Sequence, residues 1–131
     1  MIQDKINILI TDCNMYYADM LARSINQRGY RAFRSYNCDQ ALIIIEHSRI
    51  DLVIIGDLLP EDDGSRMQGI LNRINVPLVR LQSYPDGRAA EAEPRLHHPA
   101  IVLAKPVPTG TLMDTVSRLI YDKEAGARLP A

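Results

Sequence analysis

Four short apolar runs constrain the fold of this chain more than any other feature of its sequence. They are Ile6–Ile10, Leu52–Ile55, Val76–Leu81 and Ala100–Leu103. Runs of this length are typical of parallel strands that are buried on both faces, and they are too short to cross a membrane as helices. The segment Tyr30–Arg34 alternates apolar and polar side chains, which indicates a further strand at the edge of a sheet.

Apolar side chains at helical spacing separate most of these strands. Helices are expected around residues 15–25, 41–45, 67–74 and 112–120. Residues 84–99 differ, because they are rich in proline and leave room for at most a short helix around 88–93. The alternation of strands and helices predicts an α/β fold with a parallel sheet covered on both faces.

The bulk properties of the chain limit its setting and partners. With 131 residues and a net charge of −1, we expect one domain that has no broad attraction for nucleic acid or anionic membranes. The first residues lack the pattern of a signal peptide, and the two cysteines are not spaced as metal ligands, so we expect a reducing cytoplasm. The domain is expected over residues 1–124, with 125–131 as a tail or the start of a linker.

Polar residues follow several of the predicted strands. In parallel α/β sheets the functional crevice lies at the carboxyl ends of the strands. The residues expected at those ends are Asp12, Cys13, Gly56, Asp57, Gln82, Ser83 and Lys105. Topology alone does not say what such a crevice does, so the function depends on these side chains.

The segment Asp51–Gly64 resembles the third strand and following loop of a two-component receiver domain. It has the apolar strand of that family, followed by Leu59-Pro60 and Asp63-Gly64 at the family's spacing. The resemblance extends over roughly residues 5–122 and includes Lys105-Pro106 after the fifth strand. It implies a flavodoxin-like, doubly wound (βα)5 fold with strand order 2-1-3-4-5 and a short or irregular fourth helix.

The resemblance also implies which residues would carry phosphorylation. In receivers, acidic residues hold Mg²⁺, one Asp accepts the phosphoryl group, a Ser or Thr contacts it, and a Lys offsets its charge. Asp12 and Lys105 match this pattern. The departures are Cys13 for the second acid, Gly56 for the acceptor, Gln82 for the hydroxyl and Val102 for the switch aromatic. Together they indicate that the phosphorylation mechanism has been lost.

Several of these residues have two interpretations. Asp12 is either a metal ligand or, as we favour, a cap of the first helix. Cys13 is either a redox sensor or, as we favour, a small buried hydrophobe. Strand alternation turns Asp57 to the opposite face, so it can replace the acceptor only if a bulge at Gly56 re-aims it. Lys105 is expected to pair with Asp12 or Asp57.

Three further features have simple expectations. The bond before Pro106 is often cis in the family, although most such bonds are trans. Asp62 and Asp63 are expected to be solvated in their loop. The pair His97-His98 is expected to be exposed and not to bind metal.

The leading hypothesis is a receiver-like domain that has lost phosphorylation and serves as a non-enzymatic protein–protein interaction module. Its expected partners are a histidine kinase, another receiver, a second copy of itself or a fused output domain. By the resemblance, its interaction surface includes Val102, Pro106, Leu112 and Met113. No cofactor or metal is expected, and Asp12 and Asp57 are only weak candidate ligands.

Two alternatives stay open. In the first, a histidine kinase phosphorylates Asp57 with Mg²⁺ present. In the second, the emptied pocket and Cys13 sense a small ligand or a redox change, which requires a lowered thiol pKa or a retained ligand. Contact with DNA by this domain is disfavoured by its near-neutral charge and the lack of a basic helix.

Overall fold

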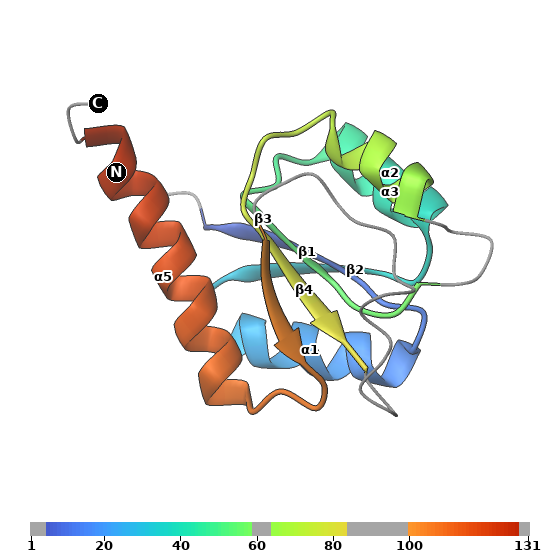
Figure 1. Cartoon of the computed structure of the whole chain (residues 1–131), viewed down its shortest axis with the longest axis horizontal. Coiled ribbons are helices and arrows are strands. Elements are labelled where there is room, and N and C mark those ends of the chain that lie inside the picture. Colours follow the sequence, from blue (N-terminus) through green and yellow to red (C-terminus); the bar gives the residue numbers. More distant parts are fainter. Residues whose placement is uncertain (1–4, 59–63, 84–99, 129–131) are drawn as a thin grey trace.

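A five-stranded parallel sheet forms the centre of the computed structural model, which describes residues 5–58, 64–83 and 100–128 (Figure 1). The strands are β1 (Asn7–Thr11), β2 (Arg31–Ser35), β3 (Leu52–Ile55), β4 (Leu78–Gln82) and β5 (Ala100–Ala104). Their order is β2-β1-β3-β4-β5, and every neighbouring pair is parallel. The predicted order 2-1-3-4-5 is therefore confirmed.

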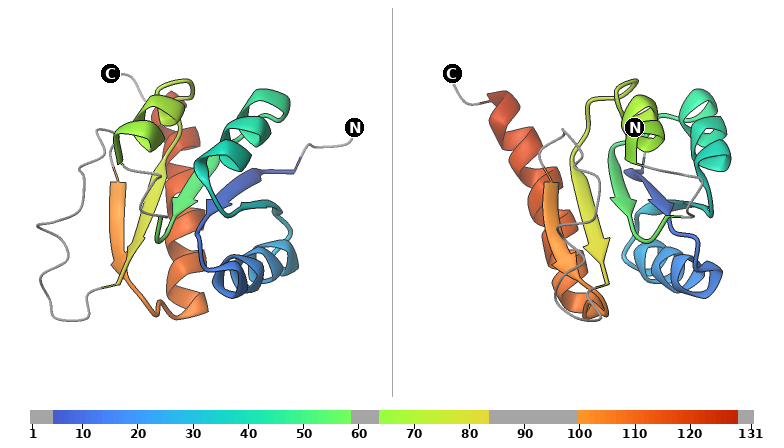
Figure 2. Two further views of the ribbon diagram at one scale, coloured as in Figure 1. Left: turned by 90° about the vertical axis from the view of Figure 1, so that its right-hand side faces the viewer. Right: turned by 45° about the vertical axis from the view of Figure 1, so that its right-hand side comes forward.

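Helices cover both faces of the sheet. They are α1 (Met15–Gln27), α2 (Cys38–His47), α3 (Gly64–Leu71) and α5 (Thr109–Arg128). The first and last pack on one face, and α2 and α3 pack on the other (Figure 2). The expected helix around 88–93, the loop acids Asp62 and Asp63, and His97-His98 lie outside the described residues. Among the described helices, none is long and apolar enough to span a bilayer.

The starts of α1 and α2 are fixed by asparagine caps. The Asn14 side chain accepts a hydrogen bond from the Tyr17 backbone N–H at 3.1 Å, and Asn37 accepts one from Gln40 at 2.8 Å. Each cap satisfies a backbone donor that has no partner within its helix. After α1, Gly29 adopts a φ of 92°, a left-handed conformation that glycine tolerates without steric cost.

The two central strands are buried on both faces. On β1 and β3, side chains at even positions contact the core beneath α1 and α5, while odd positions contact the core beneath α2 and α3. This alternation follows from the pleat of a strand. It explains why Leu52–Ile55 reads as a continuous apolar run with no polar break.

Helix α5 differs from the sequence expectations in which residues it buries and in where it ends. Leu112 and Met113 are buried in the core, so placing them on an interaction surface was wrong. They lie on the inner face of an amphipathic helix, where apolar side chains pack against the sheet. Val102 is 51% exposed and Pro106 is exposed, so both lie at the surface as expected. The helix continues to Arg128, so the boundary placed at residue 124 falls within it.

The core predicts a specific cost for truncating β3. Ile54 is fully buried, and Ile54→Ala should lower the free energy of unfolding by about 2–5 kcal/mol because it leaves a cavity. Ile43 on α2 is 58% exposed, so Ile43→Ala should change it by about 0.5 kcal/mol or less. Chemical denaturation of both variants measures the difference. Equal costs would contradict the assignment of Ile54 to the core.

Candidate functional site

Backbone hydrogen bonds hold the segments that follow β1 and β3 side by side. The Gly56 N–H donates to the Thr11 carbonyl, and the Cys13 N–H donates to the Asp57 carbonyl, both at 2.8 Å. These bonds continue the register in which Thr11 pairs with Ile55, so Asp12 lies opposite Gly56. Paired residues on parallel strands project to the same face of the sheet. A side chain at position 56 would therefore compete with that of Asp12 for the same space.

The Asp12 carboxylate fills the space above Gly56. A Cβ atom at position 56 would lie 2.7 Å from Asp12 Cγ and closer still to Oδ2, which is nearer than real Cβ atoms approach other atoms. Asp12 itself is fully buried, and its Oδ1 accepts a hydrogen bond from the Asn14 N–H at 2.9 Å. Glycine at position 56 thus allows Asp12 to take this position.

Lys105 joins the acidic groups of the site. Its Nζ lies 2.6 Å from Asp12 Oδ2 and 3.1 Å from Asp57 Oδ2, so it pairs with both expected partners. The side chains of Lys105 and Asp12 are 9% and 1% exposed, whereas Asp57 is 42% exposed. Nζ also lies 4.2 Å from the centre of the Tyr17 ring, within the range of a cation–π contact. We call Asp12, Asp57 and Lys105 the ion cluster.

Opposing effects act on the pKa of Lys105. Burial alone would lower this pKa, because it penalises the charged ammonium. The hydrogen bond and charge of Asp12, followed by those of Asp57, outweigh burial and raise the pKa above its usual value. Lys105 therefore stays protonated at neutral pH. Removing one partner from a buried ion pair typically costs about 3–5 kcal/mol, since it leaves the other charge without compensation.

Asp57 lies in the ion cluster, so the expectation that it turns to the opposite face was wrong. The regular strand β3 ends at Ile55, and strand alternation does not extend to Asp57. Its Oδ2 also lies 3.4 Å from Ser83 Oγ, a contact at the long end of hydrogen-bonding distance. The structure thus brings together Asp57 and Ser83, which follow β3 and β4.

Asp12 does not cap α1, contrary to the interpretation that the sequence favoured. Asn14 is the cap, and Asp12 instead accepts the backbone N–H of Asn14 while its other oxygen binds Lys105. Both residues precede the helix and both have side chains suited to capping, so the sequence does not separate them. The long-range partner at residue 105 decides the role of Asp12.

The Cys13 thiol has a raised pKa and lies beside two carboxylates. Burial raises its pKa, and the neighbouring negative charges of Asp12 and then Asp57 raise it further. A raised pKa lowers the fraction of thiolate, which is the reactive form. Cys13 is partly exposed, whereas Cys38 is fully buried. The expectation that Cys13 is a buried hydrophobe holds only in part.

The described donor set does not fit Mg²⁺. Both oxygens of Asp12 are engaged, Cys13 is a soft ligand in place of a carboxylate, and the Lys105 ammonium bridges the two remaining acids. Within residues 5–58, 64–83 and 100–128, no group of three or more acidic, cysteine or histidine side chains could hold a metal ion. Lys105 supplies one positive charge against the two carboxylates of the ion cluster, which leaves a net charge of −1.

Gln82 lies beside the ion cluster without joining it. Gln82 ends β4, and its backbone carbonyl accepts from the Lys105 N–H at 2.8 Å. In the described part of the chain, no side-chain hydrogen bond links Gln82 to the ion cluster. The Lys105-Pro106 peptide bond is cis, as the resemblance suggested.

Sequence reasoning missed Tyr17, whose ring contacts Lys105. Burial raises the pKa of its hydroxyl. Its position on the first turn of a helix that starts beside the carboxyl end of β1 was the available signal.

Sequence reasoning also missed a buried pair of hydroxyl groups. Thr11 Oγ1 and Ser35 Oγ lie 2.8 Å apart and join the ends of β1 and β2.

The contact between Asp12 and position 56 predicts an unusual cost for a small substitution. Gly56→Ala should lower the free energy of unfolding by about 1–3 kcal/mol, because the new methyl group must displace the buried carboxylate. Gly69 is the matched control, since its helical site is open and Gly69→Ala should stabilise by about 0.5–1 kcal/mol. Denaturant titration distinguishes the two. A neutral Gly56→Ala would rule out the crowding described here.

The raised pKa of Lys105 predicts alkaline sensitivity with a definite sign. Because the folded pKa exceeds the unfolded value of about 10.4, the stabilising contribution is complete below that pH and is lost as pH rises through the folded pKa. Stability measured by denaturation should therefore fall less steeply above about pH 10 in Lys105→Met than in the unmodified protein. Lys5→Met removes an exposed lysine and should keep the steep fall. Equal slopes in all three proteins would argue against the pairing.

Comparisons with known proteins agree on the fold. No family model matches the chain. The transcriptional regulatory protein ZraR of Salmonella typhimurium is 25% identical over 134 aligned residues, which include all of this chain and 30% of that protein. ZraR of Salmonella typhi gives the same values. The chain thus spans about a third of the length of these curated relatives.

Solved structures give the same result at lower identity. A CheY-like receiver domain protein from Methanospirillum hungatei has a TM-score of 0.80 and 17% identity, covering 94% of this chain and 99% of its own. A two-component response regulator from Clostridium difficile has a TM-score of 0.77 and 22% identity, covering 89% and 97%. NtrX from Brucella abortus, in complex with ADP, has a TM-score of 0.80 and 18% identity, covering 95% of this chain and 29% of its own. The chain has the receiver-domain fold of two-component response regulators.

Proposed function

We propose that this domain is a pseudo-receiver, a phosphorylation-independent protein–protein interaction module in two-component signalling. It catalyses no reaction and requires no cofactor. The observation that carries the proposal is the buried Asp12 carboxylate, which occupies the space above Gly56 and pairs with Lys105. That pairing gives Lys105 a partner before any phosphoryl group arrives.

Electrostatics supports this function. An incoming phosphoryl group is anionic and needs positive charge that is available to stabilise it. Lys105 already contacts two carboxylates, so a phosphoryl group would have to displace at least one of them. The site is therefore held in one arrangement by its own charges.

The partners in this proposal are proteins. A histidine kinase, another receiver, a second copy of the chain or a fused output domain would each fit a domain that presents a fixed surface. The curated relatives are transcriptional regulatory proteins of which this fold spans only 30%, which supports a role beside an output domain. Val102 and Pro106 are exposed and belong to the proposed surface.

A second candidate function is a conventional phosphoacceptor on Asp57. The observation in its favour is that Asp57 is 42% exposed and lies near both Ser83 Oγ and Lys105 Nζ. The hydroxyl of Ser83 and the ammonium of Lys105 are two of the groups that a phosphoaspartate needs.

The redox alternative has less support, because the raised pKa of Cys13 is the opposite of what a sensor thiol requires.

Beryllium fluoride with Mg²⁺ distinguishes the two functions, since it mimics a phosphoryl group on an aspartate. We expect no saturable amide NMR shifts near Asp57, Ser83 and Lys105 at millimolar ligand, because Lys105 already pairs with two carboxylates and the ion cluster keeps a net charge of −1, which disfavours an anion.

The control compares two variants of equal charge. Shifts that saturate, vanish in Asp57→Ala and persist in Asp114→Ala would establish the phosphoacceptor and overturn the proposal. Asp114 is exposed on α5 and has no contact with the ion cluster, so its removal tests the effect of net charge alone.

A further inference from the structure

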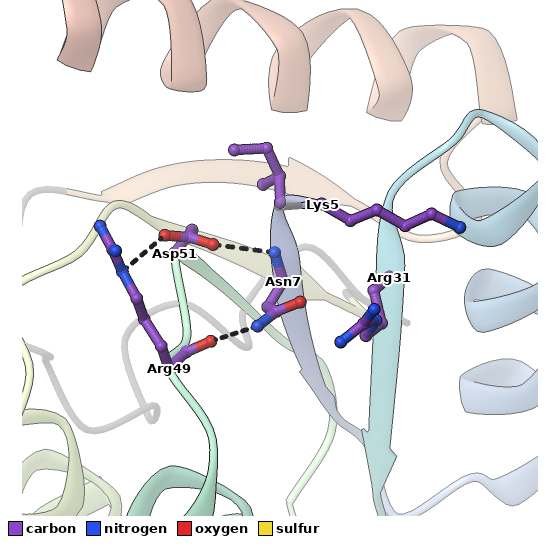
Figure 3. A pocket seen from close by; sticks show the side chains of 6 residues that line it. Lys5, Asn7, Arg31, Arg49 and Asp51 are labelled. Carbon is purple, nitrogen blue, oxygen red and sulfur yellow. Dashed lines mark hydrogen bonds and ion pairs between the residues drawn. The ribbon is translucent and has the colours of Figure 1, made fainter. Parts of the chain in front are cut away.

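A basic hollow lies at the amino-terminal edge of the sheet, the end opposite the ion cluster. It has a volume of about 370 Å³ and is lined by Lys5, Ile6, Asn7, Arg31, Arg49 and Asp51. These residues come from the starts of β1 and β2 and from the segment that precedes β3. In Figure 3, Lys5 and Arg31 lie on one side of Asn7, with Arg49 and Asp51 on the other.

The charges of this hollow are unbalanced. Lys5, Arg31 and Arg49 each contribute +1 and Asp51 contributes −1, which leaves a net charge of +2 among the lining residues that the structure describes. Lys5 and Arg31 make no ion pair or hydrogen bond through their side chains within the described residues. The sequence as a whole has a net charge of −1, so this concentration of positive charge is local.

Asp51, the one carboxylate among the described lining residues, is already engaged. Asp51 Oδ2 accepts the Asn7 backbone N–H at 2.8 Å, and its Oδ1 lies 3.5 Å from Arg49 Nε. The Asn7 side-chain Nδ2 in turn donates to the Arg49 carbonyl at 2.6 Å (Figure 3). Asn7 therefore holds the backbone segment that contains Arg49 and Asp51. The charges of Lys5 and Arg31 remain available for a ligand.

We propose that this hollow binds a small phosphomonoester. A phosphomonoester carries a charge of about −1.5 to −2 at neutral pH, which matches the net charge of +2 on the described lining residues. Guanidinium groups bind phosphate oxygens in a bidentate manner, and Arg31 is placed to supply one. The volume lies at the lower end of the range for small-molecule sites, about 300–1,000 Å³, so a compact metabolite fits better than a large one.

The proposal does not rest on the function assigned to the ion cluster. The two sites lie at opposite ends of the strands, and no residue belongs to both. Failure of either proposal leaves the other intact. A ligand at the amino-terminal edge would contact β1, β2 and the segment before β3, and would stabilise the folded chain by mass action.

The test is a titration of the whole chain with glycerol phosphate, inorganic phosphate and acetate, followed by amide NMR. We expect saturable shifts at Asn7, Arg31 and Asp51 with glycerol phosphate in the millimolar range or below, and weaker binding of acetate because it carries less charge. Arg31→Gln should weaken glycerol phosphate binding by about tenfold or more, as loss of a charge-assisted hydrogen bond does. Arg23→Gln makes the same charge change on α1, outside the hollow, and should weaken it less than about twofold.

Several results would overturn the proposal. Absence of saturable shifts in all titrations would show that the hollow binds no such anion. Equal weakening by Arg31→Gln and Arg23→Gln would reduce the effect to a general charge attraction. Co-sedimentation with vesicles containing phosphatidic acid, without binding of glycerol phosphate, would assign the charge to a lipid surface. Circular dichroism of both variants checks folding, which we expect to be unchanged because both arginines are at the surface.

Discussion

The ion pair between Lys105 and Asp12 is the interaction on which the candidate site depends. The two side chains are only 9% and 1% exposed, so water contributes little to stabilising either charge. A buried pair of this kind is costly to break, because the remaining charge is left in a medium that cannot stabilise it. The pair also links the end of β1 to the segment after β5, which are distant in the sequence. Because Lys105 also contacts Asp57, the ion cluster joins the segments that follow β1, β3 and β5.

Gly56 completes this arrangement because it has no side chain to displace the Asp12 carboxylate. Paired positions on parallel strands share a face, so the buried Asp12 carboxylate is compatible with glycine at position 56 and not with a larger residue. Glycine at position 56 and the buried position of Asp12 thus depend on each other. In the proposed function, the charges that would receive a phosphoryl group are satisfied internally. The opposite edge of the sheet is different, since its cations exceed its acids.

The fold could be predicted from the sequence because its pattern depends on local chemistry. Short apolar runs and helical spacing specify strands and helices without reference to distant residues. The ion cluster was harder, because its geometry depends on where chain segments meet. Lys105 was correctly expected to pair with Asp12 or Asp57, but the sequence did not indicate that it would contact both.

The errors have physical causes of the same kind. The predicted direction of the Asp57 side chain was wrong because strand alternation does not extend past the end of β3 at Ile55. Asp12 and Asn14 have equivalent capping chemistry two residues apart, so the sequence alone does not show that Asn14 is the cap. Leu112 and Met113 were placed on a surface by family resemblance, although their helical spacing puts them in the core. Tyr17 gave no motif to recognise, and only the assembled structure brings its ring to Lys105.

A double-mutant cycle between positions 12 and 56 tests the central claim most directly. The free energy of unfolding is measured for the unmodified protein, Gly56→Ala, Asp12→Ala and the double variant. If the Asp12 carboxylate occupies the space above Gly56, the alanine at 56 should destabilise the unmodified protein but have little effect once Asp12 is removed, with a coupling of about 1 kcal/mol or more. Equal effects of Gly56→Ala in both backgrounds would show that the two positions do not compete, and would contradict this account of the site.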